Sequence, residues 1–158
     1  VKAYNQIFET PYTIIRPSAL YGERCVSRRV GQIFIENSLQ GLDIEINGSG
    51  KEKLDFTYID DFMSGIILCC EKESAKNQTF NLTFGKSREI NDLIQILKKT
   101  FPKINVKYKN KEKFMPERGT LKIDKAKKLL DYNPQYEIEK GYTKYIDWYK
   151  NFWDESQK

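Results

Sequence analysis

Histidine is absent from this chain of 158 residues, and its absence excludes several kinds of site. Without histidine the chain holds no Ser-His-Asp triad, no imidazole general base and no imidazole metal ligand. Cysteine is scarce as well, since only Cys25, Cys69 and Cys70 occur, an odd number with two adjacent. That pattern gives neither a disulfide framework nor the spacing of a zinc site, so we predict reduced thiols and no metal.

Long apolar runs are also missing. The longest one extends only from Ile66 to Cys70, whereas a membrane-spanning helix needs about 20 apolar residues. No basic and then apolar leader opens the chain, so a signal peptide is not expected. With reduced cysteines, this favours a cytoplasmic protein that does not enter a membrane.

Positive charge is present in excess. The formal net charge is +5, and residues 98–128 carry twelve basic side chains against three acidic ones, Glu112, Glu117 and Asp124. Such a segment can bind nucleic acid or a phosphorylated small molecule, and it is also typical of an ordinary solvated face. The segment contains no known nucleic-acid motif, which argues against nucleic acid. A basic non-catalytic module that binds nucleic acid or mediates dimerisation stays as the alternative function.

Short predicted strands alternate with helices, the pattern of an α/β fold. Residues 1–9 predict the end of a helix, and the apolar run 12–16 predicts a strand that Pro17 terminates. Ligands of open α/β sheets bind beyond the carboxyl ends of the strands, so residues 17–22 are the first candidate site. Further strands are expected at 43–47, 54–59, 78–82 and 104–108, and helices at 30–39, 62–69, 90–97, 126–130 and 138–152.

Two details of these helices are predicted from side-chain chemistry. Asp60 or Asp61, and likewise Asp124, should cap the helix that follows, because a carboxylate accepts hydrogen bonds from the free N–H groups of a first turn. The aromatic residues of 138–152 are interpreted as a packing surface.

Four motifs then occur in a fixed order: residues 16–22 (RPSALYG), 54–61 (LDFTYIDD), 80–85 (FNLTFG) and 118–127 (RGTLKIDKAK). Together they resemble the extended short-chain dehydrogenase/reductase family, and within it the branch of NAD-dependent nucleotide-sugar epimerases and dehydratases. The resemblance covers nearly the whole chain. It departs from the family at Ala19 and Leu54, where many relatives have an asparagine and an arginine that contact the diphosphate.

The resemblance implies a partial fold. The family has a glycine-rich cofactor loop and a Tyr-x-x-x-Lys pair, and the only formal match to the pair, Tyr136 to Lys140, lies in the wrong place. We therefore expect a C-terminal substrate-binding lobe with the last strand of a Rossmann-type fold, without the N-terminal dinucleotide-binding part. Residues 1–22 would be the final helix and strand of the Rossmann part, and residues 23–158 the substrate-binding α/β lobe. No catalytic residue is assigned.

The resemblance also assigns the site. Residues that would contact NAD, which the missing part would mainly bind, are Pro17, Ser18 and Leu20. Residues that would contact the nucleotide sugar are Arg28, Arg29, Glu45, Asn47 and Arg118. Of these, the two adjacent arginines open a helix whose free N–H groups also favour an anion.

The expected function is to bind the substrate of an NAD-dependent nucleotide-sugar epimerase or dehydratase in polysaccharide precursor synthesis. The chain should be inactive alone and should form a homodimer. A first strand without parallel neighbours would expose apolar edges, so self-association or a rearranged sheet is expected.

Overall fold

The computed structural model of the chain describes residues 1–111, 114 and 116–156, with only the backbone at 155 and 156. Its helices are α1 (Lys2–Phe8), α2 (Val30–Leu39), α3 (Ile59–Glu71), the short 3-10 helix η1 (Glu73–Ala75), α4 (Ile90–Thr100), α5 (Asp124–Leu130) and α6 (Ile138–Ser156). Its strands are β1 (Thr13–Arg16), β2 (Leu20–Tyr21), β3 (Ile44–Asn47), β4 (Lys53–Leu54), β5 (Thr57–Tyr58), β6 (Gln78–Asn81), β7 (Arg88–Glu89) and β8 (Val106–Lys109). Glu112 and Lys113 of the basic segment lie outside the described residues.

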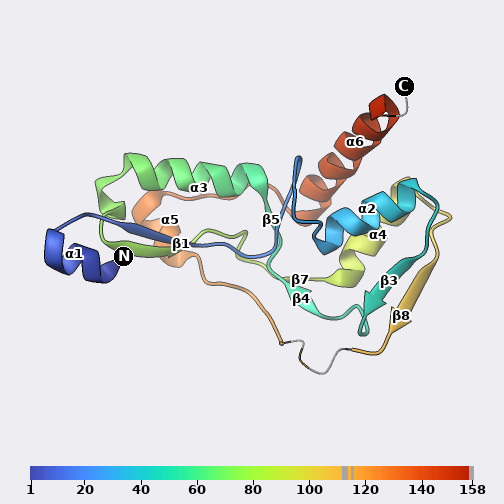
Figure 1. Cartoon of the computed structure of the whole chain (residues 1–158), viewed down its shortest axis with the longest axis horizontal. Helices are drawn as coiled ribbons and strands as arrows, with labels where there is room; N and C mark the ends of the chain where they lie inside the picture. Colours follow the sequence, from blue (N-terminus) through green and yellow to red (C-terminus); the bar gives the residue numbers. More distant parts are fainter. Residues whose placement is uncertain (112–113, 115, 157–158) are drawn as a thin grey trace.

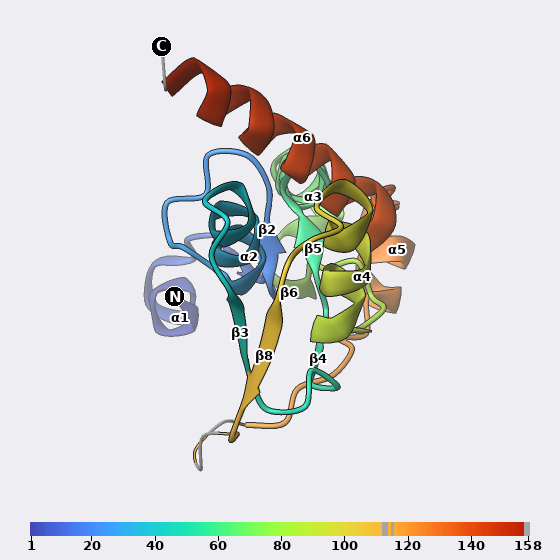
Figure 2. The same ribbon diagram turned by 90° about the vertical axis from the view of Figure 1, so that its right-hand side faces the viewer.

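The strands associate in pairs. β1 with β6, β2 with β5, and β3 with β8 are parallel, while β4 with β7 is antiparallel. Parallel pairs need crossover connections, and helices supply them here, which confirms the predicted α/β class. Figure 2 shows β3 and β8 side by side between α2 and α4.

The buried apolar side chains form two separate hydrophobic cores. The larger core joins α2, α4 and α6 to β3 and β5, and the smaller one joins α5 to β6 and α3. In Figure 1 these lie towards opposite ends of the molecule, with α6 projecting from the larger one. The aromatic stripe of α6 is a packing surface, as predicted, since Tyr142, Tyr145 and Tyr149 are all buried.

A glycine sets how closely α6 approaches the strands. A Cβ on Gly141 would lie 2.1 Å from the Tyr21 hydroxyl and 3.3 Å from the Tyr58 ring. The next residue, Tyr142, donates a hydrogen bond to the Gly31 carbonyl at 2.8 Å, which ties α6 to the start of α2. A residue without a side chain is thus required where α6 crosses β2 and β5.

The capping predictions were wrong. Tyr58 precedes α3 and Ile123 precedes α5, and no side chain among the described residues caps either helix. Asp61 instead accepts hydrogen bonds from the backbone N–H groups of Gln135 and Tyr136 at 2.7 and 2.9 Å. Asp60 pairs with Lys144, whose Nζ lies 3.0 Å away. Both aspartates lie inside the first turn of α3, so their carboxylates reach other segments.

The predicted strand 54–59 is divided. β4 ends at Leu54 and β5 begins at Thr57, and the fully buried Asp55 lies between them. None of the helices in the described part of the chain combines the length and the apolar character that a membrane crossing requires.

Candidate functional site

A cavity of about 1090 Å³ opens beside the larger core, at the carboxyl ends of β1 and β2. This volume lies just above the range typical of ligand sites, about 300–1,000 Å³. Its walls come from residues 17–27, the start of α2, β3, residues 49–54 and residues 116–118. The strand-end location is the one predicted from residues 17–22.

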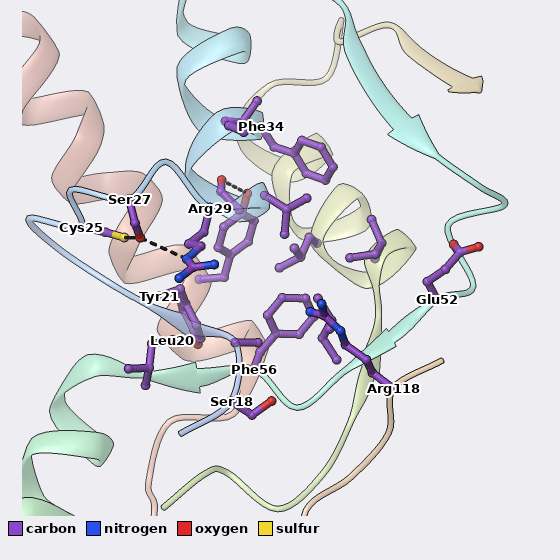
Figure 3. Close-up of a pocket in the computed structure, with 18 of the residues that line it drawn as sticks. Ser18, Leu20, Tyr21, Cys25, Ser27, Arg29, Phe34, Glu52, Phe56 and Arg118 are labelled. Atoms are coloured by element: carbon purple, nitrogen blue, oxygen red, sulfur yellow. Dashed lines mark hydrogen bonds between the residues drawn. The ribbon is translucent and has the colours of Figure 1, made fainter. Parts of the chain in front are cut away.

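Aromatic side chains line the inner part of the cavity (Figure 3), among them Tyr21, Phe34, Phe56 and Tyr142. Each is nearly or fully buried. Burial raises the pKa of Tyr21 and of Tyr142 well above the ordinary value of a phenol. These phenols therefore stay neutral, and the aromatic lining offers surfaces against which a base or a sugar ring can stack.

Three arginines line the cavity, Arg24, Arg29 and Arg118, and the last two come from different elements. Arg29 lies at the start of α2 and Arg118 on the segment that precedes α5, and Figure 3 shows them on either side of the aromatic lining. Arg29 donates from Nε to the Ser27 hydroxyl at 3.0 Å. Among the described residues, neither guanidinium pairs with a carboxylate. A cavity with two such arginines favours a ligand with two negative charges.

The other predicted substrate contacts lie in different environments. Arg28 does not line the cavity, and its guanidinium pairs with Glu36 at 3.0 Å. Glu45 and Asn47 line the β3 wall, where Lys109 donates to the Glu45 carboxylate at 2.6 Å. The geometry thus brings Arg29 towards the ligand space and turns its neighbour Arg28 away.

The predicted cofactor contacts gather at one end of the cavity. Pro17, Ser18 and Leu20 all line it. Ala19 between them has φ of 37°, a left-handed conformation in which non-glycine residues are uncommon. The formal Tyr-x-x-x-Lys match lies elsewhere: Lys140 Nζ is 4.4 Å from the centre of the Tyr136 ring, and neither residue lines this cavity.

Two carboxylates that support the cavity were missed from the sequence. Asp55 is fully buried and accepts hydrogen bonds from the Thr83 hydroxyl and from the N–H groups of Gly85 and Leu121. Glu23 accepts a hydrogen bond from the buried Tyr58 hydroxyl. A signal for the first was present, since an aspartate between Leu54 and Phe56 is unusual in a strand with apolar neighbours.

Comparison with known proteins identifies relatives. The model of the NAD dependent epimerase/dehydratase family matches residues 1–83. A UDP-glucuronate 4-epimerase of Thermodesulfobacterium geofontis is 30% identical, over 93% of this chain and 46% of its own. A putative UDP-glucose 4-epimerase of Methanocaldococcus jannaschii is 28% identical, over 96% of this chain and 50% of its own. The chain thus spans about half the length of the curated relatives it matches.

A solved structure has the same fold over this part. The UDP-glucuronic acid 4-epimerase of Bacillus cereus, in complex with UDP-glucuronic acid and NAD, superposes with a TM-score of 0.88 at 26% identity. The match covers 96% of this chain and 49% of the epimerase.

Proposed function

Because the chain belongs to the NAD-dependent epimerase/dehydratase family, we propose that its cavity binds a nucleotide sugar as the substrate-binding portion of such an enzyme. The whole enzyme would act in polysaccharide precursor synthesis in the cytoplasm, as a homodimer. Relatives named for UDP-glucose and UDP-glucuronate support the substrate class.

The observation that carries this proposal is the pair of arginines beside an aromatic lining. A nucleotide sugar presents a diphosphate, a base and a sugar ring. The forked guanidinium groups of Arg29 and Arg118 match phosphate oxygens in shape and charge. Phe34 and Phe56 offer apolar faces to the rings, and Glu45 and Asn47 of β3 offer polar atoms to the base.

This chain would form only a small part of the NAD site. NAD supplies a hydride acceptor and donor when bound, and Pro17, Ser18 and Leu20 line the end of the cavity where its nicotinamide would lie. They offer it a surface but no phosphate-binding loop, so most of the cofactor would be held by residues outside this chain. The chain's own task is to bind and orient the sugar nucleotide, and we expect no turnover by the chain alone.

Binding of UDP-glucose, measured by isothermal titration calorimetry, tests the proposal. Arg118→Ala should weaken binding at least about tenfold, because a charged hydrogen bond contributes about 1.5–3 kcal/mol. Lys98→Ala is the matched control, since Lys98 is an exposed cation of α4 that does not line the cavity. Failure of the unaltered chain to bind any UDP-sugar would refute the proposal.

The nucleic-acid alternative has less support from the structure. Lys107 and Lys109 of the basic segment lie on β8. They form ion pairs with Asp43, which precedes β3, and with Glu45 of β3. Part of the segment's charge is therefore neutralised within the fold. Salt-dependent retardation of a single-stranded or duplex oligonucleotide would favour the alternative.

A further inference from the structure

The loop that delivers Arg29 to the cavity has an unfavourable backbone conformation. This arginine loop, residues 23–29, joins Gly22 to α2 and contains no helix or strand. Arg24 has φ of 62° and Arg28 has φ of 38°, and such left-handed conformations cost a non-glycine residue of order 1–3 kcal/mol. Contacts with the rest of the fold are therefore needed to keep the loop in this shape.

One of these contacts is made at the first residue of the loop. The Tyr58 hydroxyl donates to the Glu23 carboxylate, at 2.6 Å from Oε1 and 2.5 Å from Oε2. Tyr58 is fully buried, and its ring packs against Tyr21 and Tyr136 with centroids 5.5 and 4.5 Å away. Burial and the bond to Glu23 raise the pKa of Tyr58, so the hydroxyl stays a donor.

A second group holds the same carboxylate. Lys144 of α6 places its Nζ 3.8 Å from Glu23 Oε1, and the same ammonium pairs with Asp60 at 3.0 Å. It also lies 4.9 Å from the centre of the Tyr58 ring. β5 and α6 thus contact the start of the arginine loop, and α3 supports this arrangement through the pair of Asp60 with Lys144.

The remaining contacts carry this restraint along the loop. Cys25 Sγ lies 3.5 Å from the Ser27 hydroxyl, and that hydroxyl accepts the bond from Arg29 Nε. The loop is therefore fixed at Glu23 and connected through Ser27 to the guanidinium that faces the cavity (Figure 3).

We propose that Glu23 is a positioning residue, held by Tyr58, that fixes the arginine loop so that Arg29 meets the phosphates of the ligand. This inference rests on the proposed function. It also gives a role to one of the four glutamates that line the cavity, which are Glu23, Glu45, Glu52 and Glu117. If only its charge mattered, the Glu23 carboxylate would repel an anionic ligand. By fixing the geometry of the loop, it instead favours binding.

A ligand-independent experiment tests the restraint on the loop. In a chain carrying Cys69→Ser and Cys70→Ser, the remaining thiol is Cys25, which is partly buried against the larger core. Tyr58→Phe deletes one hydroxyl and should raise the rate of Cys25 alkylation by N-ethylmaleimide at least about threefold. Tyr132→Phe, which removes a buried hydroxyl in the smaller core, should leave the rate unchanged. Equal rates in both variants would overturn the inference.

Calorimetric titration with UDP tests the link to Arg29. Tyr58→Phe should raise the Kd of UDP roughly tenfold, in keeping with the loss of a hydrogen bond to a charged group. In an Arg29→Ala background the same substitution should change the Kd by less than about twofold, because Tyr58 is proposed to affect UDP binding only by placing Arg29. If Tyr58→Phe weakens UDP binding equally with and without Arg29→Ala, the positioning role would be overturned.

Glu23→Gln provides a second variant, and the direction of its effect on UDP affinity separates two possible roles of Glu23. If Glu23 acted only through its charge, its removal would tighten UDP binding, whereas the positioning role predicts weaker binding. Glu71→Gln, at the exposed end of α3, controls for the loss of a carboxylate. An unaltered chain that binds no UDP would refute the proposed function together with this role, while UDP binding that neither variant weakens would refute this role alone.

Discussion

A single buried carboxylate connects the segments that form one side of the cavity. Asp55 Oδ1 accepts from the Gly85 N–H at 3.0 Å, and Oδ2 accepts from the Thr83 hydroxyl at 2.9 Å and the Leu121 N–H at 3.1 Å. Its neighbours Leu54 and Phe56 line the cavity, and Leu121 follows Arg118 closely in the chain. This side chain therefore sets where Phe56 and Arg118 lie relative to each other.

Replacing this carboxylate should destabilise the fold. In Asp55→Asn an NH₂ group must face at least one backbone N–H donor, which leaves a buried donor unsatisfied and costs about 1–3 kcal/mol. Urea unfolding followed by circular dichroism measures the change. Asp154→Asn, an exposed substitution on α6, should stay within about 0.5 kcal/mol of the unaltered chain. If the two variants unfold alike, Asp55 does not hold these segments together.

Residue-level prediction from the sequence was uneven for physical reasons. Pro17 and Arg118 lie in motifs that are local in the chain, so their presence at the cavity could be anticipated. Both Arg28 and Arg29 were expected at the substrate, and the physical reason that separates them lies in Glu36, which pairs with only one of them. Glu23 was missed because its partner Tyr58 is distant in the sequence and close only in the fold.

At the scale of elements, apolar periodicity predicted the helices and most strands near their observed bounds. Helix starts were less predictable, because an aspartate beside a helix can bond its own first turn or another segment, and Asp61 does the latter. The division between β4 and β5 was missed for a similar reason. Three donors from distant segments hold the carboxylate of Asp55 between the two strands.

Arg88 of β7 links two helices, and this link should depend on pH. Its guanidinium donates to Asp92 of α4 at 2.8 Å and to Glu139 of α6. The bond from Arg88 lowers the pKa of Glu139 below its ordinary value of 4.5. Burial raises the pKa of Asp92, but bonds from Arg88 and the Glu89 N–H outweigh it and the net shift is downward from 3.8.

The lowered pKa values of Asp92 and Glu139 both make the fold more stable at neutral pH than in acid. A carboxylate with a lowered pKa in the folded state stabilises the fold above its unfolded pKa, and the contribution is lost as the pH falls through the folded value. Arg88→Ala should therefore cost up to about 1 kcal/mol at pH 7, as for partly exposed pairs, and less near pH 3. The side chain of Lys98 pairs with no acid among the described residues. Lys98→Ala should therefore change the free energy of unfolding by an amount that does not vary with pH. A constant difference for Arg88→Ala would contradict the prediction.

At the scale of the whole molecule, the apolar surface is concentrated at α1. This helix buries none of its residues, and Tyr4, Ile7 and Phe8 are 67%, 70% and 63% exposed. Within the described part of the chain, β1 pairs only with β6, so its other edge is open. Exposed apolar side chains beside an open strand edge favour association with another chain.

The chain should therefore self-associate, and α1 should be the surface responsible. Burying an isoleucine contributes about 1.5–3 kcal/mol, so Ile7→Lys should weaken the association at least about tenfold. Sedimentation equilibrium over a range of concentrations measures it. Leu42→Lys, at a residue that follows α2 and is 52% exposed, is the matched control and should leave the association unchanged. If Leu42→Lys weakens it equally, the contact surface lies away from α1. If the unaltered chain stays monomeric at every concentration, the open β1 edge does not recruit a second copy, and the exposed face of α1 would not be a self-association surface.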